Sequence, residues 1–113
     1  MPNEDSSILS SSYILDEEEK ETVLGTTVIE IVRQDPKRVF LLIQNRSDTD
    51  VFISTKQNIT TSTGFRLIAN YGSLSYTKRD HGSLVTKAHF GITSVATKTV
   101  VSQEALAIRK PGK

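Results

Sequence analysis

Short apolar runs alternate with polar turns along most of this chain, and that rhythm limits the folds it can adopt. The pattern begins after Gly25, where residues 26–32 are dense in β-branched side chains, which suit strands better than helices. We expect further strands over residues 39–44, 51–54, 65–68, 73–77, 84–88, 90–95 and 98–102. Strand and turn signals spaced about 8 to 12 residues apart indicate a β-sandwich or barrel. We therefore predict an all-β fold, a single antiparallel β-sandwich of jelly-roll or Ig-like type with an extended N-terminal arm.

Two of these runs lie close together in the sequence RVFLLIQNRSDTDVFIS, residues 38–54, separated by the polar residues 45–50. Short polar side chains bond their own backbone and tolerate turn geometry, so we expect the two runs to form one antiparallel hairpin. The first run is apolar on both faces. It should be covered by a second sheet on one face, and by an arm, a loop or a neighbouring subunit on the other. We also expect most of the four phenylalanines, at positions 40, 52, 65 and 90, in the core.

Acidic and basic residues are unevenly distributed along the chain. At 113 residues the chain has the size of one domain. Residues 1–21 carry seven acidic side chains and one basic side chain, whereas the remainder carries 13 basic and 6 acidic ones. A terminal block of like charge is typical of a solvated tail or of a segment that binds a partner. We expect an acidic arm over residues 1–22, a β-sandwich over residues 23–106 and a basic tail over residues 107–113.

The arm holds the residues that we expect to bind a partner, an apolar anchor followed by four acids. They are Tyr13, Ile14, Leu15, Asp16, Glu17, Glu18 and Glu19. Asp16, with Glu19 three residues later, has the form of a helix cap and its return partner, which predicts one or two helical turns through Glu21. A segment that is merely solvated stays open as the alternative.

Residues suited to catalysis or metal binding are few. The chain has no cysteine and two histidines, His81 and His89, with no third group placed to complete a catalytic set. We expect His81 to be a solvated turn residue and His89 to be a sheet residue with an exposed tip. Asp48 and Asp50 lack the rest of a calcium loop and are expected to stabilise the turn. We therefore predict no catalytic site, no metal site, no cofactor and no enzyme activity.

Membrane and nucleic-acid roles are also disfavoured by the sequence. No basic start is followed by an apolar signal core, and no apolar run approaches the roughly 18 residues of a membrane helix. Nucleic-acid binding would need clustered bases with aromatic platforms. The residues that could supply them are Arg66, Lys78, Arg79, Lys87, Tyr71 and Tyr76. Their spread over several turns is more typical of an ordinary solvated surface.

The order of strands and turns resembles small virion proteins of tailed bacteriophages and related viruses, over roughly residues 23–104. The matching positions are Arg38, Asn45, Ser47, Asp48, Val51, Ile53, Thr61, Gly64, Leu67, Gly72 and Ser73. The chain departs from that pattern at residues 68–71, where a proline-glycine turn would be expected. The resemblance implies a structural protein of a virus particle, made in the host cytoplasm and usually oligomeric.

We therefore expect a virion structural protein, a capsid decoration or cement subunit or another head or tail accessory subunit, that binds neighbouring capsid or tail proteins. A homo-oligomer is expected, because partner contacts help a small domain to stay folded. We also expect an edge strand near Val28 to be paired or covered in the assembly. The alternative function is a ligand-binding β module for carbohydrate or single-stranded nucleic acid.

Overall fold

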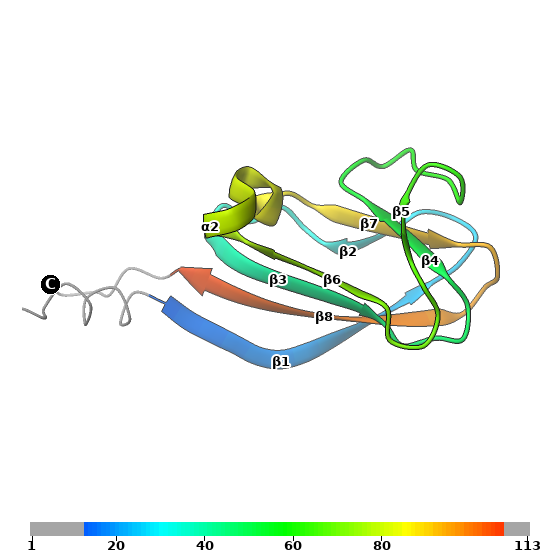
Figure 1. The fold of residues 1–113 in the computed structure, drawn as a ribbon, viewed down its shortest axis with the longest axis horizontal. Helices are drawn as coiled ribbons and strands as arrows, with labels where there is room; N and C mark the ends of the chain where they lie inside the picture. Colours follow the sequence, from blue (N-terminus) through cyan, green and yellow to red (C-terminus); the bar gives the residue numbers. More distant parts are fainter. Residues whose placement is uncertain (1–12, 108–113) are drawn as a thin grey trace, which may run out of the picture.

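The computed structural model describes residues 13–107, with side chains described from Glu19 onward, and it consists of two packed antiparallel sheets (Figure 1). The first sheet contains, in spatial order, β1 (Tyr13–Leu24), β8 (Lys98–Ala107), β3 (Arg38–Asn45) and β6 (Ser73–Thr77). The second contains β2 (Ile29–Val32), β7 (His89–Thr93), β4 (Val51–Ser54) and β5 (Phe65–Leu67). A helical turn, α2 (Lys78–His81), and the 3-10 helix η1 (Gly82–Thr86) connect β6 to β7.

The pairing of the strands identifies the type of sandwich. β1 pairs with β8, β2 with β7, β3 with β6 and β4 with β5, so the first strand meets the last and each pair lies inside the one before it. A long hairpin rolled into two four-stranded sheets has this pairing, which is the eight-stranded jelly roll. The expectation of an all-β antiparallel sandwich is confirmed, and of the two types left open the strand order is that of the jelly roll.

The expectation of a hairpin between residues 39–44 and 51–54 is wrong. β3 pairs with β6 and β8 in the first sheet, whereas β4 pairs with β5 and β7 in the second. The polar segment between β3 and β4 therefore crosses from one sheet to the other. Leu41 and Ile43 of β3 are buried between the sheets, while Phe40 and Leu42 on its other face are half-buried.

The helical turn expected between Asp16 and Glu21 is also wrong, because these residues belong to β1. β1 runs across residues 22 and 23, where we placed the boundary between arm and sandwich. Tyr13 lies in register with Ala107 and Thr22 with Val100, with an irregularity between Asp16 and Lys20. Pairing with β8 supplies hydrogen bonds along most of the strand, whereas an isolated helix of one or two turns is marginal in water.

Two further strand boundaries differ from those expected. Residues 82–86 form η1, so most of the strand expected at residues 84–88 is a 3-10 helix. β8 continues to Ala107, beyond the expected end at residue 102, because β1 and β3 both pair with it there. The remaining expected strands are present, with ends shifted by a few residues.

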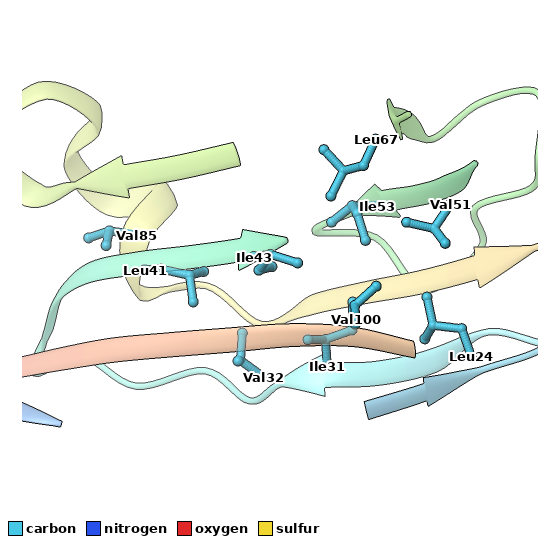
Figure 2. Close-up of a cluster of buried hydrophobic side chains, with 10 residues drawn as sticks. All are labelled: Leu24, Ile31, Val32, Leu41, Ile43, Val51, Ile53, Leu67, Val85 and Val100. Atoms are coloured by element: carbon cyan, nitrogen blue, oxygen red, sulfur yellow. The ribbon is translucent and has the colours of Figure 1, made fainter. Parts of the chain in front are cut away.

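A cluster of buried aliphatic side chains fills the space between the sheets (Figure 2). Its members come from both sheets and from η1: Leu24, Ile31, Val32, Leu41, Ile43, Val51, Ile53, Leu67, Val85 and Val100. Gly91 of β7 leaves the room they need, because a Cβ there would lie 2.8 Å from Cδ1 of Ile31 and 2.9 Å from Cδ1 of Leu24. Burial of each such side chain stabilises the fold by about 1.5 to 3 kcal/mol.

A smaller apolar cluster lies on the opposite face of the second sheet. Ile59, in the loop between β4 and β5, packs with Phe90 and Ile92 of β7 and with the half-buried Phe52. Of the four phenylalanines expected in the core, Phe90 is buried and two are half-buried, while Phe65 is 60% exposed. The expectation is wrong for Phe65, whose ring lies at the surface of the molecule.

Candidate functional site

The expected partner-binding residues of the arm lie in β1, at the edge of the first sheet. The backbone from Tyr13 to Asp16 is in register with β8 from Ala107 to Glu104. The side chain of Glu19 is exposed, and its carboxylate lies 3.6 Å from the guanidinium of Arg46. The other expected contact side chains, and the expected arm and tail residues 1–12 and 108–113, lie outside what the structure describes. β2, near Val28, is likewise an edge strand, of the second sheet.

A turn between β5 and β6, which we call the Tyr71 knuckle and define as residues 68–72, has an unusual backbone. Asn70 and Tyr71 have φ angles of 64° and 81°, in the left-handed region that favours glycine. Asparagine tolerates this region, but a bulky side chain such as tyrosine is strained there. A Cβ on Gly72 would lie 2.5 Å from the carbonyl oxygen of Ile68, so only glycine fits the next position.

Backbone hydrogen bonds hold the knuckle against the end of β3. The Tyr71 N–H donates to the Asn45 carbonyl at 2.8 Å, and the Asn45 N–H donates to the Gly72 carbonyl at 2.7 Å. The Asn70 N–H donates to the Ser47 carbonyl at 2.8 Å. The strained conformation is therefore fixed by the crossing between β3 and β4.

The buried side chain of Asn45 ties the same crossing together. Its amide nitrogen lies 2.9 to 3.1 Å from the carbonyl oxygens of Thr49, Leu67 and Ile68. Its amide oxygen accepts from both the N–H and the hydroxyl of Ser47, at 2.9 and 2.7 Å. One side chain thus joins the β3–β4 crossing to the start of the knuckle.

The rigid knuckle presents two exposed apolar side chains. Ile68 is 56% exposed and Tyr71 is 66% exposed. The guanidinium of Arg46 lies over the Tyr71 ring, 5.9 Å from its centroid, within cation–π range. Tyrosine and arginine are enriched among the residues that contribute most to protein–protein binding. This arrangement suits a contact surface better than it suits catalysis.

The aspartates of the β3–β4 crossing bind groups from other segments of the chain rather than the backbone of their own turn. A carboxylate oxygen of Asp50 accepts from the Ala69 N–H at 2.8 Å. Asp48 lies 2.8 Å from the Lys98 ammonium, which lowers the pKa of the Asp48 carboxyl through a hydrogen bond and charge attraction.

His81 is exposed, and its Nδ1 accepts from the Thr77 N–H at 3.0 Å, in keeping with the solvated role expected for it. The expectation of an exposed tip is wrong for His89, which is 1% exposed. His89 Nδ1 lies 2.9 Å from the Lys87 carbonyl oxygen, which can only accept, so this nitrogen carries the proton and Nε2 is a lone-pair acceptor. Nε2 is buried with no hydrogen-bond partner among the described residues. Burial lowers the pKa of His89, and the positive charge of Arg38 lowers it further. The hydrogen bond to the Lys87 carbonyl acts in the opposite direction.

Two clefts open at opposite sides of the sandwich. The first, of about 370 Å³, lies between β1 and β2, and charged side chains dominate its lining. Arg38 lies at its base, 1% exposed, and donates to Glu104 at 2.7 Å and to the carbonyl oxygens of Val85, Lys87 and Arg33. Since these bonds engage every nitrogen of the guanidinium, Arg38 has a structural role.

The second cleft, which we call the β5–β6 cleft, has a volume of about 270 Å³ and lies where β5 and β6 are the edge strands. Its apolar lining consists of Ile53, Phe65, Leu74 and Leu84. Its polar lining includes His89 and Tyr76, whose ring centroids are 5.4 Å apart. Burial raises the pKa of Tyr76, so its hydroxyl stays protonated at neutral pH.

The residues considered for nucleic-acid binding do not form one platform. Tyr76 is half-buried and packs on His81 and His89, whereas Tyr71 is exposed at the knuckle. The Arg66 guanidinium lies 3.6 Å from the Asp50 carboxylate. An aromatic surface for stacking bases would need both rings free.

Among the side chains that the structure describes, those of residues 19–107, no group of three or more acids or histidines is placed for a metal ion. In the same part of the chain, no helix is long and apolar enough to cross a membrane. Comparison of the chain with known protein families, characterised proteins and solved structures gives no match.

Proposed function

We propose that the protein is a structural subunit of a virus particle, a capsid decoration or cement subunit or another head or tail accessory subunit. The Tyr71 knuckle would bind a neighbouring capsid or tail protein, and copies of the chain would associate with one another. The observation that carries the proposal is an exposed tyrosine held in a backbone conformation that favours glycine.

Strain of this kind is informative because it lowers stability. A non-glycine residue in an unfavourable φ region costs about 1 to 3 kcal/mol, and it persists only where the surrounding structure enforces it. Here the enforcing groups are Asn45 and Ser47, which bond the backbone on both sides of the ring. Glycine at position 71 would relieve the strain and would also remove the exposed ring. A role in contact is one reason for the chain to keep tyrosine there.

The fold and the sequence resemblance support the same proposal. Jelly rolls form viral capsid proteins, and they also form lectin domains and cupins. One fold hosts many functions, so the fold alone does not decide between them. The resemblance to small virion proteins favours the first.

The arm remains the second proposed contact. Glu19 and Glu21 are exposed on the edge strand β1, and charge on an edge strand discourages pairing with other chains of like charge. A basic strand or surface on a neighbour would complement this edge. The apolar anchor Tyr13–Leu15 and the acids that follow it would then add to the contact.

Replacement of Tyr71 with glycine tests the proposal. Tyr71→Gly relieves the positive φ, so the free energy of unfolding should stay the same or rise, while binding to particles assembled without the protein should fall at least about tenfold. Phe65→Ala is the matched control, because it removes another exposed aromatic ring, on β5 and outside the knuckle.

Binding is measured by sedimentation of the particles with added protein, and stability by urea unfolding. Unchanged binding by Tyr71→Gly would contradict the proposed contact. So would an equal loss of binding in Phe65→Ala.

A further inference from the structure

The β5–β6 cleft combines an apolar wall with a small size. Phe65 and Leu84 are exposed, and the half-buried Leu74 lies in the same lining. Its volume of about 270 Å³ lies just below the range of roughly 300 to 1,000 Å³ that is usual for ligand sites. A cleft of this size suits a single ring rather than a longer chain.

The polar lining of the cleft is rich in hydroxyl groups. Ser54, Thr55, Thr63 and Tyr76 each place a hydroxyl-bearing side chain along it. Hydroxyl groups both donate and accept hydrogen bonds, so they match a ligand that carries hydroxyls of its own.

His89 adds an unpaired hydrogen-bond acceptor to this lining. Its Nε2 is an acceptor without a partner among the described residues, inside a side chain that is 1% exposed. A buried acceptor without a partner is destabilising, and a ligand O–H or N–H would satisfy it. Nε2 itself is buried, so a ligand would reach it only after a neighbouring side chain moved. Tyr76, which is half-buried against the imidazole, is the neighbour in contact.

None of the nine side chains that line the cleft is an acid, a lysine or an arginine. A phosphate or carboxylate would have no cation to bind, and an ammonium group would have no anion. The ligand that matches the cleft is therefore uncharged, with hydroxyls at its edge and an apolar face for Phe65.

From these features we infer that the β5–β6 cleft binds one ring of an uncharged saccharide. The C–H face of the ring would pack on Phe65, and one hydroxyl would donate to His89 Nε2. This inference does not depend on the proposed assembly role, because the cleft and the Tyr71 knuckle are built from different residues.

Titration of the full chain with single sugars tests the inference. The ¹⁵N-labelled protein is followed by NMR as methyl glycosides of glucose, galactose, mannose and N-acetylglucosamine are added, with glucose 6-phosphate as a charged comparison. At least one neutral sugar should shift the amide signals of Thr55, Phe65 and Leu84 and the imidazole signal of His89 Nε2. Glucose 6-phosphate should bind more weakly than the best neutral sugar.

Two matched variants then place the site. Phe65→Ala should weaken sugar binding about tenfold, because the stacking surface is lost. Ile68→Ala removes a similarly exposed apolar side chain, 56% against 60% exposed, beyond the other end of the same short strand, and should leave sugar binding unchanged. Both positions are at the surface, so both proteins should fold.

Several results would overturn the inference. They are the absence of shifts at the cleft with every neutral sugar, tighter binding of the phosphate, or equal weakening by Ile68→Ala. Sugar binding that persists in the Tyr71→Gly protein would show that the cleft acts independently of the knuckle. If Phe65→Ala loses sugar binding but still binds particles, the result supports the cleft as a separate site and does not affect the proposed assembly role.

Discussion

Asn45 shows how much of this fold depends on one buried amide. Its nitrogen donates to carbonyl groups from two separate segments, and its oxygen accepts two bonds from Ser47. An aspartate side chain has nearly the same shape but carries only acceptors. It therefore cannot donate to the carbonyl groups that the Asn45 nitrogen binds.

We expect Asn45→Asp to lower the free energy of unfolding by about 3 kcal/mol or more, because the carbonyl groups of Leu67 and Ile68 lose their donor and face a buried charge. Gln44→Glu is the control, since it makes the same chemical change at the neighbouring half-buried residue and should stay within about 0.5 kcal/mol. Urea unfolding at pH 7 measures both. An equal loss of unfolding free energy in the two variants would show that the side-chain bonds of Asn45 do not stabilise the β3–β4 crossing.

His89 should make stability depend on pH. Burial places its folded-state pKa below the unfolded value near 6.5, so the neutral ring favours folding above pH 6.5. As the pH falls below 6.5 the unfolded chain takes up the proton first, and this contribution is lost as the pH approaches the folded-state pKa. The charge of Arg38 acts in the same direction, and the neutral ring of Tyr76 lies beside the imidazole, with the ring centroids 5.4 Å apart.

The measurement is urea unfolding between pH 8 and pH 5 for the unchanged protein and for His89→Phe. The slope between pH 7 and pH 5 should be smaller in His89→Phe. His81→Ala is the control for the removal of an exposed histidine. An identical slope in all three proteins would contradict the role given to His89.

At the scale of the elements, the strands that face the core were predictable because alternation is a local property. Leu41 and Ile43 point inward at every second position of β3, and the same holds for Val51 and Ile53 of β4. The pairing between strands was not predictable in this way. Whether residues 45–50 close a hairpin or cross between sheets depends on Asn45 bonding Leu67 and Ile68, residues far along the chain.

Contacts between residues far apart in the chain also explain the other differences between the expected and the observed structure. β1 has an acidic sequence with a helix-cap pattern, and only its pairing with β8 makes it a strand. The strands expected at residues 65–68 and 73–77 leave a connection between them where the knuckle lies, but the positive φ at Tyr71 leaves no mark in the sequence. The one visible signal was the departure of residues 68–71 from the resembling pattern. The β5–β6 cleft was missed because its lining comes from five separate segments.

The packing of β7 against its neighbours gives a prediction at the same scale. Gly91→Ala places a methyl group within 3 Å of the buried side chains of Ile31 and Leu24, so we expect a loss of about 1 to 3 kcal/mol. Gly25→Ala is the matched control, since no atom lies within 4 Å of the added carbon, and it should be neutral or slightly stabilising. Thermal unfolding compares the two, and equal effects would contradict the tight packing at Gly91.

For the whole molecule, the part played by β1 decides where the folded unit begins. The strand pairs with β8 along most of its length and is the outer edge of the first sheet. If residues up to 22 were only an arm, their removal would leave the sandwich intact. If β1 is part of the sandwich, their removal leaves β8 as a new edge with open hydrogen-bonding groups, and such edges pair with other chains.

Two truncated chains separate these cases, one that begins at Tyr13 and one that begins at Val23. We expect the chain from Val23 to unfold at a lower temperature than the chain from Tyr13 and to self-associate, because most of the β1 pairing is gone and buried residues of β8 such as Val101 lose a neighbour. Differential scanning calorimetry measures the first effect and light scattering after size-exclusion chromatography measures the second. A chain from Val23 that stays monomeric, with the unfolding temperature of the longer one, would instead support the original boundary at residue 22. In that case the acidic segment would be free to bind a partner without disturbing the sandwich.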